Sequence, residues 1–384
     1  MNKFDATGAK LTKDSIGSRR LLIALYVTAV SLYWISLYLY VPTLPLYAKD
    51  KADNLALVGI ILSMYGLWQA IIRLPLGITA DWLGWRKPFI IMGFALAGLG
   101  AYVMGAANGA NELIIGRALT GLAAGTWVPL VVVFSSFFPP SEAVRASALL
   151  TLSGSAGRML ATSLTGWLNE QWGYQLAFLL AAAAAALSVI IILPLQEERH
   201  PPQRPSARGI GQLIVRRDVL FPSLLSAVSQ YANWGVTFGF LSILAKQLGA
   251  SDIIQSILVA MNLGLVTIGN LAATAIVRRI GARRLVYTSF LLMSLGIGGA
   301  ALAFSLPMVF LAQFCMGLSQ GIGYPVLMGM SIEHVAEAER TTAMGLHQAV
   351  YAIGMFSGPW LSGILADTIG LQPMFGVTMF ACLV

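Results

Sequence analysis

Long apolar runs separated by short polar stretches dominate the chain. A helix needs about 20 apolar residues to cross the hydrocarbon core of a bilayer. Runs of roughly that length, and a final shorter one, lie at 21–47, 56–80, 88–107, 113–137, 146–168, 175–195, 219–244, 253–277, 285–304, 308–332, 342–366 and from Pro373 onward. The last run stops at Val384, so we expect a twelfth transmembrane helix that is truncated in this chain.

Composition supports a membrane protein. The chain is 57% hydrophobic and only 10% charged, with a mean hydropathy of +0.77. A soluble protein of this length would need more polar surface than that. The net charge of +8 is spread over short loops, so we interpret it as an orientation pattern and expect no nucleic-acid partner. The polar first twenty residues do not have the pattern of a removed signal peptide.

The runs fall into two sets of six. A polar, proline-rich stretch at 196–218 separates them, which predicts an N-terminal bundle over 1–195, a cytoplasmic linker over 196–218 and a C-terminal bundle over 219–384. The two halves repeat at an offset of about 197, as "GLAAGTWVP" and "GLSQGIGYP" illustrate. Parallel six-helix repeats are one way in which secondary transporters are built.

The lysines and arginines predict the orientation. With the N-terminus in the cytoplasm, 18 of the 24 lie on the inner side, 3 on the outer side and 3 within the spans. Because cytoplasmic loops are enriched in Lys and Arg, we expect the N-terminus and the linker inside, in the inner or plasma membrane of a cell.

The turn between the second and third runs carries a recognisable motif. It contains Gly77, Asp81, Gly84, Arg86 and Lys87, and a degenerate copy follows one half later. In this pattern the chain resembles the major facilitator superfamily, in a branch similar to drug exporters. The resemblance implies an all-α membrane protein of 12 transmembrane helices in two pseudo-symmetric six-helix bundles. Trp82 replaces one base of the family pattern.

The motif has a physical interpretation. Gly77 would let helices approach closely, Gly84 would permit the tight turn, and Asp81 would meet the N-terminal end of helix 11. The resemblance implies that this cluster latches the cytoplasmic side in the outward-facing state. The alternative is a positive-inside loop with a solvated acid.

Arg158 is the most distinctive ionisable residue within a span. No Asp or Glu lies in the middle of a span, so no carboxylate is expected to pair with it. It follows a run of small residues that faces either the central cavity or a neighbouring helix. We interpret it as an anion-binding group, against the alternative of an arginine satisfied by backbone carbonyls. Gly157-Arg158 also departs from the Gly-Pro pair that antiporters of this family carry in helix 5.

Three further ionisable groups lie within spans. Arg117 matches the family's helix 4 arginine, which the resemblance links to proton coupling; the alternative is snorkelling to the outer interface. Arg73 is expected to serve gating or packing, although its Arg-x-Pro setting also resembles the nitrate-transporting branch. Because histidine side chains ordinarily titrate near neutral pH, His347 is a coupling candidate, unless it is only a satisfied polar residue.

Aromatic and amide side chains complete the expected substrate site. Their mixture suits a medium-sized amphipathic molecule. With Arg158, the predicted lining is Trp34, Tyr38, Trp127, Gln230, Asn233, Trp234, Gln320, Tyr324, Gln348 and Tyr351. We expect Tyr40, Tyr47, Trp85 and Trp172 at the headgroup level instead.

These observations favour a secondary transporter. No catalytic residues, metal ligands, nucleotide motif or cofactor site are predicted, and a receptor on the same fold is a weaker alternative. We expect a monomer in the lipid bilayer that works by alternating access, with proton-coupled efflux of a small amphipathic compound. The alternative is an organic-anion symporter or exchanger that binds the anionic group through Arg158.

Overall fold

The computed structural model describes residues 13–139, 142–195, 216–336 and 340–383, and all regular structure in these ranges is helical. The first bundle comprises α1 (Lys13–Tyr38), α2 (Leu44–Lys49), α3 (Leu55–Leu83), α4 (Lys87–Gly105), α5 (Ala110–Ala124), α6 (Trp127–Ser136), α7 (Ala143–Trp172) and α8 (Tyr174–Ile192). The second comprises α10 (Arg217–Ala232), a π-helical segment (Asn233–Phe240), α11 (Leu241–Gln247), α12 (Asp252–Ile280), α13 (Ala282–Ala301), α14 (Leu306–Ile332), α15 (Arg340–Ile369) and α16 (Leu371–Leu383).

The predicted spans match these helices closely. In the described residues, nine spans are long and apolar enough to cross a membrane, with α5 and α6 forming one of them. The other predicted spans correspond to α7, to α10 with its continuation, and to α16, which has 13 residues. The predicted linker lies outside the described residues except for 216–218.

Three predicted spans are interrupted where the sequence expectation was continuous. The run 21–47 divides between α1 and α2 around Pro42, which has no N–H to donate to a preceding turn. The run 113–137 breaks at Gly125 and Thr126, and Pro129 lies in the first turn of the new helix. The run 219–244 widens into the π-helical segment, where Gly235 lies against Gly358 of α15.

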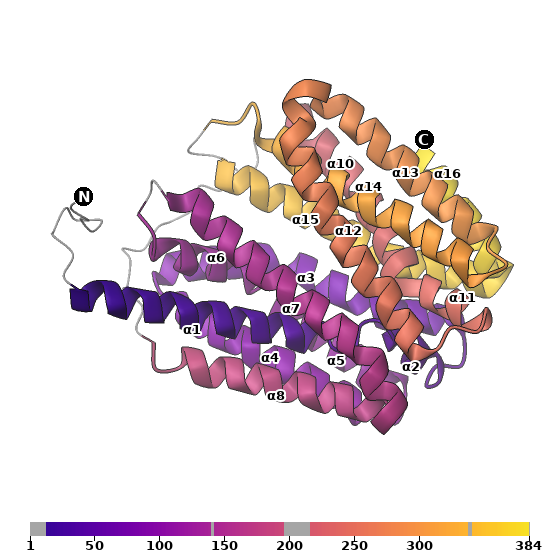
Figure 1. The fold of residues 1–384 in the computed structure, drawn as a ribbon, viewed down its shortest axis with the longest axis horizontal. Helices are drawn as coiled ribbons and strands as arrows, with labels where there is room; N and C mark the ends of the chain where they lie inside the picture. The colour runs from indigo at the N-terminus through magenta and orange to yellow at the C-terminus, as the bar shows by residue number, and fades with distance from the viewer. Residues whose placement is uncertain (1–12, 140–141, 196–215, 337–339, 384) are drawn as a thin grey trace.

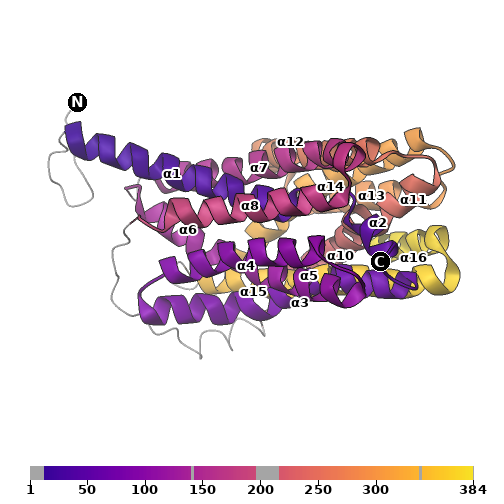
Figure 2. The ribbon, with the colours of Figure 1, turned by 90° about the horizontal axis from the view of Figure 1, so that it is seen from below.

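The two bundles lie side by side, and their contacts differ between the two pairs of facing helices (Figure 1). Helices α7 and α12 converge at one end and diverge toward the end where the N-terminal helix begins. Helices α3 and α15 run along each other (Figure 2). A Cβ built on Gly363 would lie 2.8 Å from the Cα of Gly59, so only glycine permits this approach.

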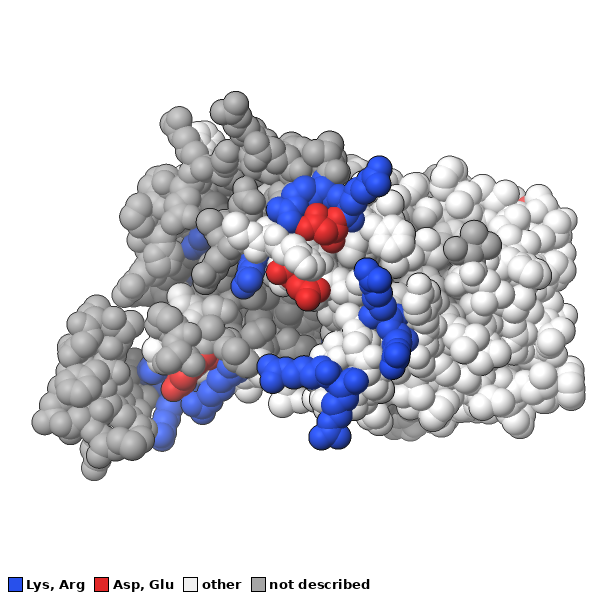
Figure 3. All heavy atoms as spheres, turned by 90° about the horizontal axis from the view of Figure 1, so that it is seen from above, with Lys and Arg blue, Asp and Glu red and all other residues white. Residues whose placement is uncertain are grey.

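Most of the described arginines and lysines gather toward one end, which we call the basic end. It carries the α3–α4 turn, the end of α8 and the starts of α10, α13 and α15, with Arg86, Lys87, Arg216, Arg217, Arg283, Arg284 and Arg340. On the face in Figure 3, blue and red spheres lie over the left and centre, and the right is almost uniformly white. The opposite end carries α2, the end of α7 and the start of α12.

Two aromatic residues predicted at the headgroup level are buried instead. Tyr40 is 1% exposed and stacks on Phe178 at 4.8 Å. Tyr47 is 7% exposed, and its hydroxyl donates to the carbonyl of Met104 at 3.1 Å. The prediction was wrong for both because the helix break near Pro42 turns this segment into the bundle. Trp85 and Trp172 are exposed, as an interfacial position requires.

Candidate functional site

Arg158 lies on α7 with its guanidinium against two aromatic rings of α1. Its Cζ atom is 4.8 Å from the Trp34 ring centre and 5.7 Å from that of Tyr38. Its Nε donates to the carbonyl of Gly154 and its Nη2 to the hydroxyl of Ser155, both at 3.2 Å. Only one of these partners is a backbone carbonyl. The side chain is half-buried, so the guanidinium retains donor capacity for a ligand.

The small residues before Arg158 face the neighbouring helix. A Cβ on Gly154 would lie 2.8 Å from the indole nitrogen of Trp34, and one on Gly157 would lie 2.7 Å from the carbonyl of Ser31. These glycines therefore let α7 approach α1 and bring Arg158 over the rings. In the described structure the buried indole N–H of Trp34 has no acceptor, which places a second donor beside the guanidinium.

A continuous series of rings links the two bundles at this depth. The ring-centre distances are 5.5 Å from Trp127 to Trp34, 5.7 Å from Trp34 to Tyr38, 6.5 Å from Tyr38 to Phe238, 5.1 Å from Phe238 to Trp234 and 5.1 Å from Trp234 to Tyr65. Tyr38 to Phe238 crosses from the first bundle to the second, and Trp234 to Tyr65 crosses back. The arrangement offers flat apolar surface from both bundles.

Arg73 makes a separate contact between the bundles. Its Nη1 donates to the hydroxyl of Tyr351 on α15 at 2.5 Å, and its Cζ lies 5.3 Å from that ring. Tyr324 of α14 lies against the same ring at 5.9 Å. Arg73 and Tyr351 are buried, so the contact is shielded from water. Arg73 and Arg158 thus use different aromatic partners, Tyr351 for Arg73 and Trp34 and Tyr38 for Arg158.

Arg117 is buried inside the first bundle and does not reach the outer interface. It is 3% exposed, its Cζ lies 4.6 Å above the Tyr65 ring, and its Nη2 donates to the carbonyl of Leu62 at 3.5 Å. Snorkelling is therefore the wrong interpretation. The guanidinium instead packs on the face of a ring, where a cation is attracted by the π-electrons.

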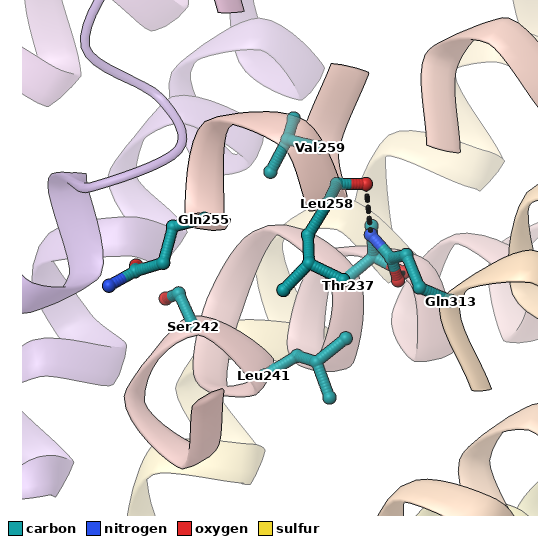
Figure 4. A pocket seen from close by; sticks show the side chains of 7 residues that line it. All are labelled: Thr237, Leu241, Ser242, Gln255, Leu258, Val259 and Gln313. Atoms are coloured by element: carbon teal, nitrogen blue, oxygen red, sulfur yellow. Dashed lines mark hydrogen bonds between the residues drawn. The ribbon is translucent and has the colours of Figure 1, made fainter. Parts of the chain in front are cut away.

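The second bundle repeats this geometry without the charge. Gln313 donates from Nε2 to the carbonyl of Leu258 at 3.5 Å, as Arg117 donates to Leu62. Figure 4 shows this bond beside a small pocket, with Thr237 near Gln313 and with Ser242 near the amide of Gln255. The chain thus places a cation in one bundle and a neutral amide at the corresponding position in the other.

His347 is fully buried in α15 and faces two serines of α10. Its Nδ1 lies 3.1 Å from the Oγ atom of Ser223, and its Nε2 lies 3.2 Å from that of Ser226. Its ring also meets that of Tyr351 at 5.9 Å. Both ring nitrogens therefore have polar partners.

The predicted lining residues with amide side chains all lie in the second bundle. Gln320 accepts a hydrogen bond from Ser229 at 3.0 Å, and Gln230 and Asn233 are buried nearby on the same chain segment. Gln348 is half-buried on α15, one position after His347. The structure does not bring these amides into contact with Arg158.

Sequence reasoning missed Tyr65, Phe238 and the two serines beside His347. Tyr65, Gln69 and Arg73 recur every four residues along α3, and residues at this spacing share one helix face. That stripe of polar groups in an apolar helix was a usable pattern. Nothing comparable distinguishes Phe238 from the other apolar residues around it.

Gly84 forms the tight turn that was predicted for it. Gly84 has a φ of 61°, a conformation that favours glycine, and Lys87 begins α4. The Nζ atom of Lys87 donates to the carbonyls of Leu193 and Leu195, where α8 ends, at 2.7 and 2.5 Å.

Two parts of the motif differ from expectation or stay untested. A Cβ on Gly77 would meet Val128 at 3.7 Å, an ordinary contact, so the close approach expected there is absent. Arg86 immediately precedes α4, and Asp81 lies in the last turn of α3, but its side chain lies outside the described residues. Its contact with helix 11 stays a prediction.

A polar cluster joins the bundles at the opposite end. Asp252, 8% exposed at the start of α12, lies 3.6 Å from Lys246 and accepts from Asn169 of α7 at 3.4 Å. Asn169 also donates to Thr43 at 2.7 Å, and the N–H of Gly166 donates to Ser256 at 2.6 Å. These bonds hold α7 against α12 where the helices converge.

Sequence comparison identifies relatives among transport proteins. The family model described as Major Facilitator Superfamily matches residues 26–228 and 223–384. The chain is 27% identical to the multidrug resistance protein MdtH of Aeromonas hydrophila over 88% of this chain and 89% of that protein. It is 34% identical to the inner membrane transport protein YajR of Escherichia coli, but over only 24% of this chain and 21% of YajR. A chloramphenicol efflux pump of Mycobacterium tuberculosis is 27% identical over 44% of this chain and 42% of the pump.

Solved structures share the same fold. A bacterial homologue of the human lysosomal transporter Spinster, in an inward-facing and occupied conformation, superposes with a TM-score of 0.79 at 14% identity, over 95% of this chain and 94% of that one. The nucleoside transporter NupG superposes with a TM-score of 0.76 at 17% identity, over 94% and 96%. The family model covers both bundles and the fold agrees with it. The chain therefore belongs to the major facilitator superfamily and is a multi-pass membrane transporter.

Proposed function

We propose that this protein exports a small amphipathic organic compound by alternating access, in exchange for protons. The observation that carries the proposal is the series of rings from Trp127 to Tyr65, which both bundles contribute beside Arg158. A ring-lined site with a few polar donors suits a compound that has a flat apolar body and one polar group. Contributions from both bundles would let a rocking motion re-expose the compound on the other side.

The names of the relatives support efflux. One relative, which matches along most of the chain, is a multidrug resistance protein, and a shorter match is a chloramphenicol efflux pump. Neither name defines the substrate of this chain. We therefore propose the direction of transport and the amphipathic class, with no single compound.

A second candidate is transport of an organic anion, by symport or exchange. Arg158 favours it, because a guanidinium on two rings beside the unpaired N–H of Trp34 offers only donors to a ligand. A carboxylate or sulfonate would accept from both. An anionic amphiphile exported by antiport would satisfy both candidates.

We assign the other polar elements to coupling and gating. Arg117 and His347 would couple transport to protons, and the α3–α4 turn with Arg73 would help to hold the basic end closed in the outward-facing state. The concentration of arginine and lysine at the basic end supports a cytoplasmic N-terminus. We further propose a monomer in the inner membrane, with bundles 1–195 and 219–384 joined by the linker 196–218.

Thermal-shift binding with R158A tests the substrate class. Purified wild type, R158A and R158K would be compared with an aromatic sulfonate, a neutral amphiphile and a lipophilic phosphonium cation at two pH values. If an anionic group binds Arg158, the sulfonate stabilises the wild type and R158K but not R158A. Arg145→Ala is the matched control, because Arg145 lies on the same helix in an exposed pair with Glu142.

Transport by reconstituted protein tests the mechanism. We expect uptake of the stabilising compound into proteoliposomes to require a pH gradient and to fall at least tenfold in R158A. Stabilisation of wild type and R158A by all three probes alike would make Arg158 structural and exclude the anion candidate. Uptake that is indifferent to the gradient would contradict proton exchange.

A further inference from the structure

Two serines of α10 lie within hydrogen-bonding distance of the two ring nitrogens of His347. Ser223 donates its only hydroxyl proton to the carbonyl of Val219 at 2.6 Å, so toward Nδ1 of His347 it can only accept. While Ser223 donates to Val219, Nδ1 is the nitrogen that carries a proton. In a neutral ring of that tautomer, Nε2 accepts from Ser226. The network accordingly favours the Nδ1–H tautomer of a neutral imidazole.

Tyr351 lies one turn after His347 and connects it to the other bundle. The ring centres of His347 and Tyr351 are 5.9 Å apart, and the Cζ atom of Arg73 lies 5.3 Å from the same Tyr351 ring centre. Arg73 also donates to the Tyr351 hydroxyl at 2.5 Å. A proton on His347 would thus place a second positive charge across one phenol from Arg73.

The surroundings offer little to neutralise that second charge. Within the described side chains, the titratable or charged groups of the helices packed on α15 are Arg73 and Tyr65 on α3, Cys315 and Tyr324 on α14, Cys382 on α16, and Arg217, Asp218 and Tyr231 on α10. Asp218 is at the basic end, paired with Arg216. On α15 itself, Arg340 and Asp367 lie at the two helix ends. Repulsion between Arg73 and a protonated His347 is therefore only weakly compensated.

We propose that Tyr351 and Arg73 are positioning residues of the proton-coupling step. The Arg73–Tyr351 bond holds α3 against α15 while His347 is neutral, and protonation of His347 releases it. This inference rests on the proposed function, in which His347 binds the transported proton. It adds the contact that protonation would release, the one between α3 and α15. Ser226 adapts by turning its hydroxyl, because the protonated ring donates from both nitrogens.

Linkage makes the proposal measurable without substrate. If a proton on His347 weakens the Arg73 contact, then Arg73 must equally weaken proton binding by His347. Replacement of Arg73 by a neutral residue should let His347 bind its proton at a higher pH. Replacement by lysine should preserve the wild-type behaviour.

Nitrogen-15 NMR of histidine-labelled protein is the test. The chain has three histidines, so the spectrum is simple and H347Q identifies the signal of His347. We expect an Nδ1–H neutral ring in the wild type, and protonation shifted upward by about one pH unit in R73Q, a tenfold change in proton affinity. R73K should titrate as the wild type. An Nε2–H ring, or equal titration in R73Q and wild type, would overturn the proposal.

Serine variants separate the network from general disturbance. S226A removes the donor to Nε2 and should broaden or shift the His347 signal. S229A is the matched control, because Ser229 lies one turn away on α10 and binds Gln320 instead. Equal effects of the two variants would contradict the assignment of Ser226.

Transport assays on the same variants distinguish the two proposals. The NMR results require no substrate and stand even if the compound is not exported against protons. If the NMR results hold but H347Q keeps gradient-driven uptake at the wild-type level, the link between His347 and coupling is overturned.

Discussion

At the scale of single residues, the two bundles differ in charge at one matching position, Arg117 in the first and Gln313 in the second. The sequence identified Arg117 as an intramembrane charge but did not identify Tyr65 beneath it, because that contact depends on how α3 packs on α5. Gln313 occupies the corresponding position of the second bundle, and each side chain donates to a backbone carbonyl. The position is therefore conformationally equivalent in the two bundles and differs in charge.

This equivalence makes Arg117→Gln an informative substitution. Glutamine already fits the matching position of the second bundle, so we expect R117Q to fold and to melt within about 2 °C of the wild type. If the charge serves coupling, gradient-driven uptake should fall at least tenfold. Melting curves and proteoliposome uptake measure the two effects.

R117K provides the control for charge. It keeps the positive charge but loses the planar contact with Tyr65, so it should retain more uptake than R117Q. Uptake in R117Q that equals the wild type would show that only the polar contact to Leu62 matters.

At the scale of elements, the lengths of the apolar runs predicted the spans within a few residues, but not their interruptions. At the breaks near Pro42 and at Gly125, backbone groups lose their partners within the helix. Surrounding helices must then provide other partners for them. The π-helical segment also depends on its fit to α15. Such features result from packing between elements and have weak local patterns.

The α3–α15 contact yields a stability prediction at this scale. Alanine at Gly363 would place its Cβ 2.7 Å from the carbonyl of Leu55, so α3 and α15 must separate. We expect G363A to lower the unfolding free energy by about 1–3 kcal/mol, as overpacking does. Thermal melting in detergent is the measurement.

Gly345 on the same helix supplies the control. A Cβ there meets nothing within 4 Å, so G345A should be neutral or slightly stabilising, because alanine favours helix. Comparable losses in G363A and G345A would contradict the assignment of the loss to the α3–α15 glycine contact.

The whole molecule is closed at the opposite end and divergent between α7 and α12 toward the basic end. The internal repeat predicted two bundles, but no sequence pattern indicated which end would be closed. One sequence must support several arrangements of a transporter, so local patterns cannot select between them. The cluster around Asp252 was missed because its partners come from three segments far apart in the chain.

Asp252→Ala should release this closure. The change removes the contact with Lys246 and the acceptor for Asn169, and bonds to a charged group contribute about 1.5–3 kcal/mol. Spin labels at the exposed residues Trp172 and Gln247, with Cys315 and Cys382 replaced by serine, would report the separation. We expect a longer-distance population in D252A that is minor in the wild type.

A variant within one bundle is the control for that measurement. Glu112 accepts from the N–H of Gly109 at the start of α5, so E112A disturbs a helix cap but no contact between bundles. It should leave the label distances unchanged. The same distribution in D252A and wild type would mean that the glycine contacts alone close this end.

Arg73, Arg117 and Arg158 all belong to the first bundle, whereas the described arginines and lysines of the second bundle lie at helix ends. When the bundles rock, three charges move together through the electric field of an energised membrane. One charge crossing the full membrane changes the energy by about 2.3 kcal/mol per 100 mV. At 100 mV, a shift of the three charges by roughly a tenth of the membrane thickness would change the energy by about 0.7 kcal/mol, or the population ratio of the two states by about threefold. Membrane voltage would therefore act on this transporter even with an electrically neutral exchange of cargo.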